Sequence, residues 1–351
     1  MSTGSELDGT SPLSLASLGW DEQWAADAER TPSAHTGVLA RVARTDVGVA
    51  RLVTPDGEVT VPAHDVVVGD WVVTDGHTWA HPLPRRTVLA RQSSDRTSTE
   101  QPLAANVDAV LVVEPMHPGA NVRRIERMLT LAWASGAEPM VVLTKTDLVP
   151  DHAGQVVADV EAAAPGVEVL AVSGETGAGL AGLRERLGPG RTFVLLGPSG
   201  AGKSTLVNAL AGREVLATGP VRGDGRGRHT TTHRLLVVVE GLGVLIDTPG
   251  IRTVGMTADA DGLAAVFADV VALAAECRFA DCAHAVEPGC AIQAAVAAGQ
   301  LEAARVDSYQ RLQREIEYQA GRKQARDRAD ERREGRARSR GAREAMRAKG
   351  R

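Results

Sequence analysis

The chain reads Gly197-Pro198-Ser199-Gly200-Ala201-Gly202-Lys203-Ser204 where an apolar segment, Thr192–Leu196, gives way to a helical pattern over Lys203–Leu210. This stretch matches GxxxxGK[ST], in which glycines let backbone N–H groups converge on phosphate oxygens at the start of a helix. It predicts a nucleoside-triphosphate site; the alternative, a glycine-rich turn without a ligand, is disfavoured by the flanking strand and helix. The residues expected to hold phosphate are Gly197, Gly200, Gly202, Lys203, Ser204 and Thr205.

A second phosphate-side motif, Asp247-Thr248-Pro249-Gly250, follows the apolar segment Gly243–Ile246 and matches DxxG. In such a site Lys203 bridges the outer phosphates and the Ser204 hydroxyl ligates Mg²⁺. We expect Asp247 to hold the same Mg²⁺ through water and the Gly250 N–H to contact the γ-phosphate. Ile251 comes next, and an isoleucine cannot hydrogen-bond water, so another group must orient the attacking water.

The segment between these two motifs supplies candidates for that role. Gly223–Thr232 is a Gly/Arg-rich stretch ending in His-Thr-Thr-Thr, where a GTPase has its first switch. We expect Thr231 to close on Mg²⁺ and the γ-phosphate, and His229 to orient water; a surface histidine in a loop is the alternative for His229. The catalytic candidates are therefore Lys203, His229 and Thr231.

Two motifs that resemble guanine-reading loops come earlier in the chain. Thr144-Lys145-Thr146-Asp147 follows an apolar segment and is similar to [NT]KxD, and Val172-Ser173-Gly174-Glu175 resembles the last GTPase motif. A carboxylate here accepts two hydrogen bonds from guanine that adenine cannot both supply, which disfavours an ATPase. An ordinary strand-to-helix turn is the alternative, and threonine in place of asparagine could weaken the tie to the phosphate loop. The residues expected to bind guanine are Thr144, Lys145, Asp147, Ser173 and Gly174.

Apolar segments alternate with helical patterns from Asn106 onward, which predicts an α/β fold with a parallel sheet. The predicted strands are Val107–Glu114, Pro139–Leu143, Val167–Val172, Thr192–Leu196, Arg234–Val239 and Gly243–Ile246. The predicted helices are Arg123–Ser135, Val156–Ala164, Leu180–Leu187 and Lys203–Leu210. The guanine motifs precede the phosphate loop, the reverse of the usual order, so we expect a circularly permuted GTPase domain. Its site can still form, because each motif follows a strand at the edge where parallel sheets bind ligands.

The N-terminal part of the chain has a different character. Residues 1–34 are rich in Ser, Thr, Gly and Asp, and we expect them to be poorly ordered. Residues 35–92 predict a small β-barrel, either an OB-fold or an SH3-like barrel, in which Trp71 and Trp79 could stack on bases. The expected barrel strands are Gly37–Val42, Gly48–Thr54, Glu58–Pro62, Asp70–Asp75 and Thr87–Arg91.

All three cysteines of the chain lie close together near its C-terminal end, in the order Cys277-x4-Cys282-x-His284-x5-Cys290. Three thiolates and one imidazole fit a closed, tetrahedral structural Zn²⁺ site without an open catalytic position. An odd number of cysteines in so short a window disfavours disulfides, and buried free cysteines are the remaining alternative.

Charge is distributed unevenly over the 351 residues, whose formal net charge is −5. From Arg322 to the end there are thirteen Lys/Arg against five Asp/Glu, about +8, so the preceding chain carries about −13. A basic tail on an acidic body indicates a polyanionic partner or a solvated, disordered tail. The sequence shows neither a secretory signal nor a membrane-spanning apolar stretch, so we expect a cytoplasmic protein without a membrane partner.

The combined order of barrel, TKTD, VSGE, GPSGAGKS, GRHTTT, DTPGI and the Cys/His cluster resembles the ribosome-small-subunit-dependent GTPase A family (RsgA, also called YjeQ) over about residues 35–315. The resemblance implies a GTP hydrolase with Mg²⁺ and one structural Zn²⁺ per chain. It implies GTP and GDP, the small ribosomal subunit and 16S rRNA as partners in late subunit maturation, with a monomeric protein expected.

The expected parts are a disordered segment (1–34), an OB-like barrel (35–92), the permuted GTPase domain (100–256), a helical zinc-binding domain (257–320) and a basic tail (321–351). Two other functions remain open at this stage. One is an RNA-binding assembly factor that uses GTP only as a conformational ligand, which Ile251 would suit. The other is a permuted GTPase of the large subunit, which the barrel and the metal cluster disfavour.

Overall fold

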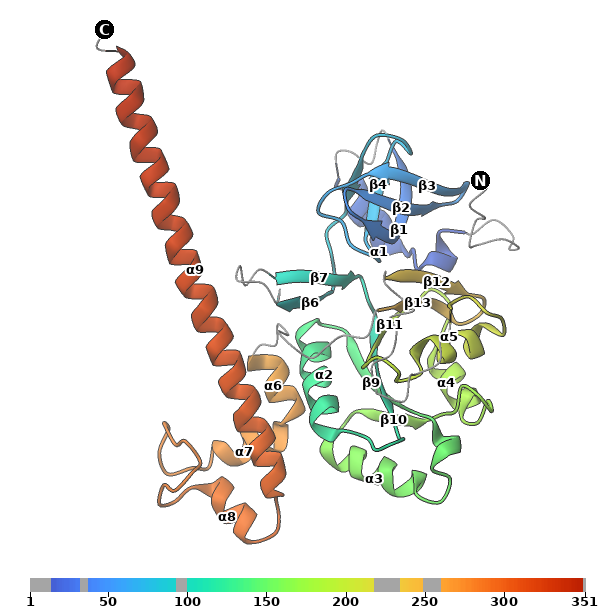
Figure 1. Ribbon diagram of the computed structural model, residues 1–351, viewed down its shortest axis with the longest axis vertical. Coiled ribbons are helices and arrows are strands. Elements are labelled where there is room, and N and C mark those ends of the chain that lie inside the picture. The colour runs from blue at the N-terminus through green and yellow to red at the C-terminus, as the bar shows by residue number, and fades with distance from the viewer. Residues whose placement is uncertain (1–13, 32–36, 93–99, 218–233, 249–259, 350–351) are drawn as a thin grey trace. The chain divides into compact units, whose positions relative to one another are not determined.

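The structure is a computed structural model that describes residues 14–31, 37–92, 100–217, 234–248 and 260–349 (Figure 1). The chain divides into two compact units. Unit 1 comprises residues 1–91 and 101–268, and unit 2 comprises residues 92–100 and 269–351. No helix within the described ranges combines the length and apolar composition that crossing a bilayer requires.

Unit 1 begins with a five-stranded antiparallel sheet in the order β3-β2-β1-β4-β5. Its strands are β1 (Val38–Asp46), β2 (Val49–Thr54), β3 (Gly57–Pro62), β4 (Trp71–Thr74) and β5 (Ala80–Pro82). The order β3-β2-β1-β4 is that of a Greek key, in which a fourth strand returns to lie beside the first. Since the OB-fold is a five-stranded Greek-key barrel, this order favours the OB interpretation over the SH3-like one.

The fifth strand of this sheet is not the one expected. The segment predicted over Thr87–Arg91 forms β6 (Val88–Gln92), which pairs with β7 (Glu100–Ala105) in a separate two-stranded sheet. Thr87 fixes this pairing, because its carbonyl accepts from the Asn106 N–H at 2.9 Å and its hydroxyl accepts from the Val107 N–H at 2.7 Å. The fifth place is taken by the three-residue strand β5, which is too short to show a pattern in the sequence.

Residues 14–31 contain two short helices, whereas we expected them to be poorly ordered. They form η1 (Ala16–Leu18) and α1 (Glu22–Glu29), and the Asp21 carboxylate caps α1 by accepting from the Trp24 N–H at 2.7 Å. Trp20 packs edge-on against Trp71 with ring centroids 4.8 Å apart. The apolar area of these indole rings orders a segment of polar composition. Trp71 is itself fully buried, so the expectation that it stacks on bases is wrong.

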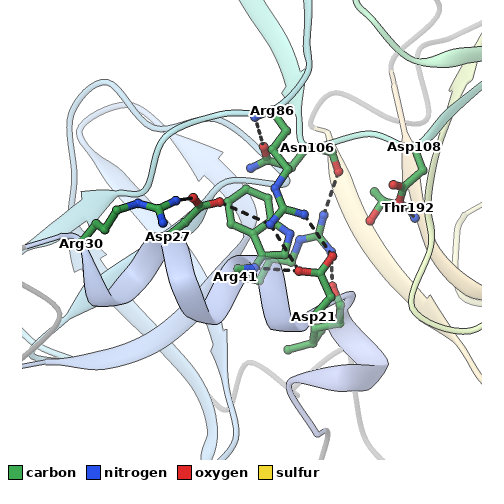
Figure 2. A network of polar contacts seen from close by, with 10 residues as sticks. Asp21, Asp27, Arg30, Arg41, Arg86, Asn106, Asp108 and Thr192 are labelled. Carbon is green, nitrogen blue, oxygen red and sulfur yellow. Dashed lines mark hydrogen bonds and ion pairs between the residues drawn. The ribbon is translucent and has the colours of Figure 1, made fainter.

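The buried guanidinium of Arg41 joins this N-terminal segment to the rest of unit 1 (Figure 2). It donates to the carbonyl oxygens of Leu18, of Gly69 at 3.3 Å and of Asn106 at 3.1 Å. Burial lowers the pKa of Arg41 to about 10, against the opposing effect of nearby carboxylates. Three segments distant in sequence therefore meet on one charged side chain.

The second sheet of unit 1 has the order β10-β9-β8-β11-β13-β12. Its strands are β8 (Ala109–Pro115), β9 (Glu138–Thr144), β10 (Glu168–Ala171), β11 (Thr192–Leu196), β12 (Leu235–Val239) and β13 (Gly243–Asp247). All neighbouring strands are parallel except β12 and β13, which pair antiparallel. The prediction of a parallel sheet is therefore wrong for this pair. The three residues between them make a tight turn, and a parallel connection needs a longer crossover.

Helices pack around this sheet, as the alternating pattern predicted. They are α2 (Val122–Ala134), α3 (Ala153–Ala163), α4 (Leu180–Arg186), α5 (Lys203–Ala211) and α6 (Ala260–Val266). The strands β8, β11 and β13 are buried throughout, and their apolar side chains share one core with α4 and α5. This core fixes the ends of the strands from which the functional loops start. Helix α6 packs on α2 within unit 1, whereas the sequence placed a domain boundary at residue 257.

Unit 2 holds α7 (Ala268–Ala274), α8 (Ala291–Ala297) and the 47-residue helix α9 (Ala303–Lys349). Arg305 near the start of α9 pairs with Asp269 through two contacts of 2.6 and 2.8 Å. Val306 and Leu312 are buried on the same part of the helix. The basic tail expected from residue 321 continues α9 without a break up to Lys349.

Candidate functional site

The phosphate-loop motif connects β11 to α5, as the sequence predicted. Gly200 and Gly202 have φ angles of +80° and +89°, a left-handed backbone that residues with side chains rarely adopt. Gly197 lies against β8, where an added Cβ would clash with the Val113 carbonyl oxygen. These glycines allow the loop to turn tightly on the carboxyl end of the sheet, directly before the N-terminus of α5.

Lys203 lies in the first turn of α5 with 7% of its surface exposed. Its ammonium donates to the carbonyl oxygens of Gly197 at 2.9 Å and Pro198 at 3.0 Å, so it folds back over the loop. Burial lowers the pKa of Lys203, while the Asp247 carboxylate acts in the opposite direction. A positive group is thus held inside the loop that the motif predicts to bind phosphate.

Ser204 and Asp247 face one another across the start of α5 and the end of β13. The Ser204 hydroxyl lies 3.4 Å from the Asp247 carboxylate, which is 1% exposed. The neighbouring Thr248 hydroxyl donates to the Leu195 carbonyl oxygen at 2.6 Å and ties the chain after β13 to β11. A hydroxyl and a carboxylate at this distance form the hard-oxygen donor set that Mg²⁺ prefers.

The TKTD segment follows β9 and turns through Lys145, whose φ angle is +62°, into η3 (Thr146–Leu148). The buried Thr144 hydroxyl donates to the Ala201 carbonyl oxygen at 2.5 Å. We expected threonine to weaken the tie between this loop and the phosphate loop, yet the hydroxyl makes that tie itself. The sequence could not identify Ala201 as the partner, because a backbone carbonyl leaves no residue-type signal.

The VSGE segment supports Asp147. The Ser173 hydroxyl donates to the Asp147 carboxylate at 2.6 Å and accepts from the Thr176 N–H at 3.1 Å. Asp147 remains exposed, so its carboxylate is accessible to a base as well. Gly174 packs on α5, where an added Cβ would lie 3.2 Å from the Thr205 methyl group.

The structure therefore brings together the guanine and phosphate motifs, although their order along the chain is reversed. They follow the carboxyl ends of four strands in one sheet: β9, β10, β11 and β13. Three expected site residues, His229, Thr231 and Gly250, lie outside the described residues.

The four Cys/His side chains gather in unit 2, with their ligand atoms within 4.8 Å of one another. The Cys277 and Cys290 sulfurs are 3.9 Å apart, and the His284 Nδ1 lies 3.6 and 3.7 Å from them. Tetrahedral coordination with Zn–S bonds of about 2.3 Å separates two sulfurs by about 3.8 Å. The geometry and the donor set are compatible with a closed zinc site.

The loop that carries His284 is held by its neighbours. The Glu287 carboxylate accepts from the N–H groups of Ala283 at 3.1 Å and Ala285 at 2.9 Å, and Gln293 donates to the His284 carbonyl oxygen at 2.7 Å. Burial opposes ionisation of Cys277, yet backbone N–H groups at the start of α8 lower its pKa overall. These contacts pre-arrange the loop for a metal ion.

Comparison with known proteins agrees with this geometry. The sequence model of a family described as RsgA GTPase matches residues 82–257. The small ribosomal subunit biogenesis GTPases RsgA of Streptomyces avermitilis and Streptomyces coelicolor are 47% and 48% identical to this chain. Each alignment covers 95% of this chain and 94% or 95% of the relative. The protein of the same name from Xanthomonas campestris is 41% identical over 88% of this chain and 91% of its own length.

Two solved structures share the fold. YjeQ from Thermotoga maritima superposes with a TM-score of 0.59 at 24% identity, covering 80% of this chain and 98% of that one. YloQ, described as a circularly permuted GTPase, gives a TM-score of 0.54 at 23% identity, covering 82% and 98%. The resemblance inferred from the motifs is confirmed, and the chain belongs to the RsgA GTPase family.

Proposed function

We propose that this chain, a GTPase by family, acts in late maturation of the small (30S) ribosomal subunit, hydrolysing GTP to GDP. The relatives that match over nearly their whole length are named for biogenesis of that subunit. Because those names describe GTPases, the alternative in which GTP is only a conformational ligand is not favoured.

Two hydrogen bonds carry the proposal. The Ser173 hydroxyl donates to Asp147 in the guanine-reading loop. The Thr144 hydroxyl donates to the Ala201 carbonyl oxygen and so couples that loop to the phosphate loop. In this proposal Asp147 accepts hydrogen bonds from the guanine base and Lys145 lies over the base plane. The Gly174 backbone N–H meets the guanine carbonyl oxygen, while Ser173, whose own N–H donates to the Ala178 carbonyl oxygen at 2.9 Å, holds Asp147 through its hydroxyl. Adenine lacks the matching donors, which would leave a carboxylate unpaired.

The residues that would bind the phosphates of the nucleotide are assigned from the chemistry of their donor groups. Lys203 and the backbone N–H groups of the phosphate loop neutralise the phosphate oxygens, assisted by the N-terminus of α5. Ser204 and Asp247 would hold Mg²⁺, which supplies charge neutralisation at the outer phosphates. The phosphate-binding residues of this proposal are Gly197, Gly200, Gly202, Lys203, Ser204, Thr205 and Gly250.

The catalytic roles remain those expected from the sequence. His229 orients the attacking water, since Ile251 cannot, and Thr231 closes on Mg²⁺ and the γ-phosphate. Lys203 stabilises charge that develops on the transferred phosphoryl group.

The remaining proposals concern the flanking parts and the cellular setting. The Cys277, Cys282, His284 and Cys290 side chains hold one structural Zn²⁺, which the sulfur and nitrogen spacing supports. We propose 16S rRNA as the direct contact on the subunit, a monomeric protein, and the cytoplasm as the place of action.

Steady-state GTP turnover tests the function directly. It is measured for the full chain alone, with purified small subunits and with purified large subunits, and Lys203→Ala serves as the control for contaminating GTPases. We expect small subunits to raise turnover at least about tenfold, a modest effect beside the roughly 10³–10⁵-fold that a catalytic group supplied by a partner can contribute. Equal turnover in all three arms, or stimulation by large subunits alone, would reject the proposal.

A further inference from the structure

Thr248 occupies a place in the DTPG segment to which the motif assigns no role. The pattern DxxG specifies the aspartate and the glycine and leaves the two residues between them open. In this chain the first of the two is 1% exposed. Its hydroxyl donates to the Leu195 carbonyl oxygen at 2.6 Å, 53 positions away along the chain. Because burying a hydroxyl is unfavourable unless it is hydrogen-bonded, this bond determines where the side chain can lie.

The bond lies where two neighbouring strands end and the loops of the site begin (Figure 1). The strands β11 and β13 are parallel, and Leu195 is paired with Asp247 in their register. Since β13 ends at Asp247, Thr248 is the first residue beyond the strand. Leu195 comes two residues before Gly197, at which the phosphate loop begins. The Thr248 hydroxyl therefore extends the connection between the two strands by one residue, at the point from which both loops start.

Asp247 is the residue that this connection holds in place. Its carboxylate is 1% exposed and lies 3.4 Å from the Ser204 hydroxyl. Ser204 follows β11 through the phosphate loop into the first turn of α5, whereas Asp247 belongs to β13. The distance between the two oxygen donors thus depends on how the end of β13 is set against β11. Mg²⁺ demands near-ideal octahedral geometry, so a displacement of about 0.5 Å at one donor impairs the site.

A second threonine makes the same kind of bond to the same segment. Thr144 ends β9 and donates its buried hydroxyl to the carbonyl oxygen of Ala201 in the phosphate loop. The segment from Leu195 to Ala201 thus accepts one threonine hydroxyl from the guanine-reading loop and one from the DTPG segment. Both bonds fix a neighbouring loop to the backbone around which the phosphate site is built.

We propose that Thr248 is a positioning residue for the Mg²⁺ of the nucleotide site. Its hydroxyl fixes the end of β13 on β11 and thereby aims the Asp247 carboxylate toward the ion that Ser204 ligates. Thr248 acts through Asp247 and not through contact with the ion, because its hydroxyl is turned toward β11. The inference rests on the proposed function for the assignment of Mg²⁺ to Ser204 and Asp247.

Variants of the full chain separate positioning from a merely structural role. Thr248→Val nearly keeps the shape of the side chain and removes the donor, whereas Thr248→Ser keeps the donor. The control is Thr130→Val in α2, since that threonine is fully buried and donates to the Glu126 carbonyl oxygen at 2.9 Å. The affinity for a fluorescent, non-hydrolysable GTP analogue is measured in EDTA and over a Mg²⁺ series. This series gives the Mg²⁺ requirement, the concentration at which half of the gain in affinity is reached.

Thr248→Val should raise the Mg²⁺ requirement about tenfold, at the lower end of the roughly 10–100-fold loss of metal affinity that follows removal of a supporting hydrogen bond. Affinity in EDTA should stay near that of the parent. Thr248→Ser should stay within about twofold of the parent, because it keeps the bond, and Thr130→Val should leave the requirement unchanged. If Thr248→Val shows no cooperative melting by circular dichroism, Thr248→Cys replaces it. The weak thiol donor should give a smaller shift in the same direction.

An unchanged Mg²⁺ requirement in Thr248→Val, or in Thr248→Cys where it replaces the valine, would overturn the inference. An equal shift in Thr248→Ser would overturn it too, because the effect would then belong to the methyl group. The same holds for an equal shift in Thr130→Val, which would assign the effect to a general loss of stability.

Asp247→Asn separates this inference from the proposed function. It should raise the Mg²⁺ requirement more than Thr248→Val does, because it removes the negative charge that faces the ion. If Asp247→Asn shifts the requirement and Thr248→Val does not, the Mg²⁺ assignment stands and the inference fails. If neither variant shifts it, the assignment of Mg²⁺ to Asp247 fails and the inference fails with it. Stimulation of GTP turnover by small subunits is measured separately in the parent and decides the proposed function in either case.

Discussion

The Thr144 hydroxyl donates a hydrogen bond to the Ala201 carbonyl oxygen at 2.5 Å, between residues separated by 57 positions of chain. One residue ends β9 and begins the guanine-reading loop, and the other belongs to the phosphate loop. Both atoms are buried from solvent. The bond couples the two loops that we propose act on opposite ends of one nucleotide, and a threonine makes it where related motifs often have asparagine.

Thr144→Ala should weaken GTP binding about fivefold to thirtyfold, because it leaves a buried carbonyl unsatisfied at a cost of about 1–2 kcal/mol. Thr144→Ser keeps the hydroxyl and should bind GTP nearly as well as the parent. Dissociation constants from a fluorescent GTP analogue check both variants. Equal weakening by serine and alanine would show that the methyl group, and not the hydrogen bond, couples the loops.

Asp147→Asn should lower affinity for GTP by about 100-fold, because an amide offers guanine a donor where the base needs an acceptor. The same amide suits xanthine, which has a carbonyl in place of the exocyclic amine. Affinity for XTP should therefore rise while affinity for GTP falls. Competition between GTP, XTP and ATP measures this exchange, and an unchanged preference for GTP would place guanine recognition elsewhere.

His229→Ala should lower kcat on the order of 100-fold with little change in GTP affinity, as expected for loss of a group that orients water. His233→Ala removes the histidine that directly follows this segment and should keep close to the parental rate. Single-turnover hydrolysis with small subunits present gives the comparison. An unchanged turnover rate in His229→Ala would remove this residue from the mechanism.

Elemental analysis of the full chain should give about one zinc, and Cys282→Ser should lose it, because a three-ligand remnant of a closed site holds the ion less tightly. Asp281→Asn alters an exposed neighbour and should retain the metal. Chelation should reduce the helical signal of unit 2 by circular dichroism. Full occupancy in the serine variant, or helical content indifferent to chelation, would contradict a structural zinc.

Arg41→Met should destabilise unit 1 by roughly 3 kcal/mol, since the buried carbonyl oxygens of Leu18 and Asn106 lose their donor (Figure 2). The Gly69 carbonyl oxygen keeps a bond of 3.2 Å from the Asn106 side-chain amide. Tryptophan emission should also shift to longer wavelength, because the guanidinium lies 5.1 Å from the Trp71 ring and holds the N-terminal segment beside it. Arg44→Met removes an exposed pair with Asp46 and should change stability by no more than about 0.5 kcal/mol. Similar melting curves for the two variants would show that the N-terminal segment is held by other contacts.

The loops proposed to bind the nucleotide could be predicted because their chemistry is carried by residue types in short, contiguous patterns. Ser204 comes after the apolar strand β11 and its phosphate loop, Asp247 ends the apolar strand β13, and the order of the sheet brings them together as expected. The Cys/His spacing likewise predicted a cluster, and the ligand atoms do converge. In each case the residues of the pattern lie close together in the chain, so short-range geometry brings them near one another.

Other features depended on contacts between distant segments. The pairing of β6 with β7, the order in residues 14–31 and the burial of Trp71 arise where chain segments meet in space. We expected the N-terminal segment to be disordered because of its polar composition. Its indole rings become buried only when they pack against the folded sheet, and composition does not reveal that contact.

The sequence by itself determined the α/β class, the permuted order of the motifs and the candidate ligands, because periodicity and short motifs are local properties of the chain. Only the tertiary structure decided that Thr144 bonds to Ala201 and that Arg41 collects three carbonyl oxygens. Backbone acceptors look the same at every position of a sequence. Which of them a side chain reaches is fixed only when the sheet and its loops have packed.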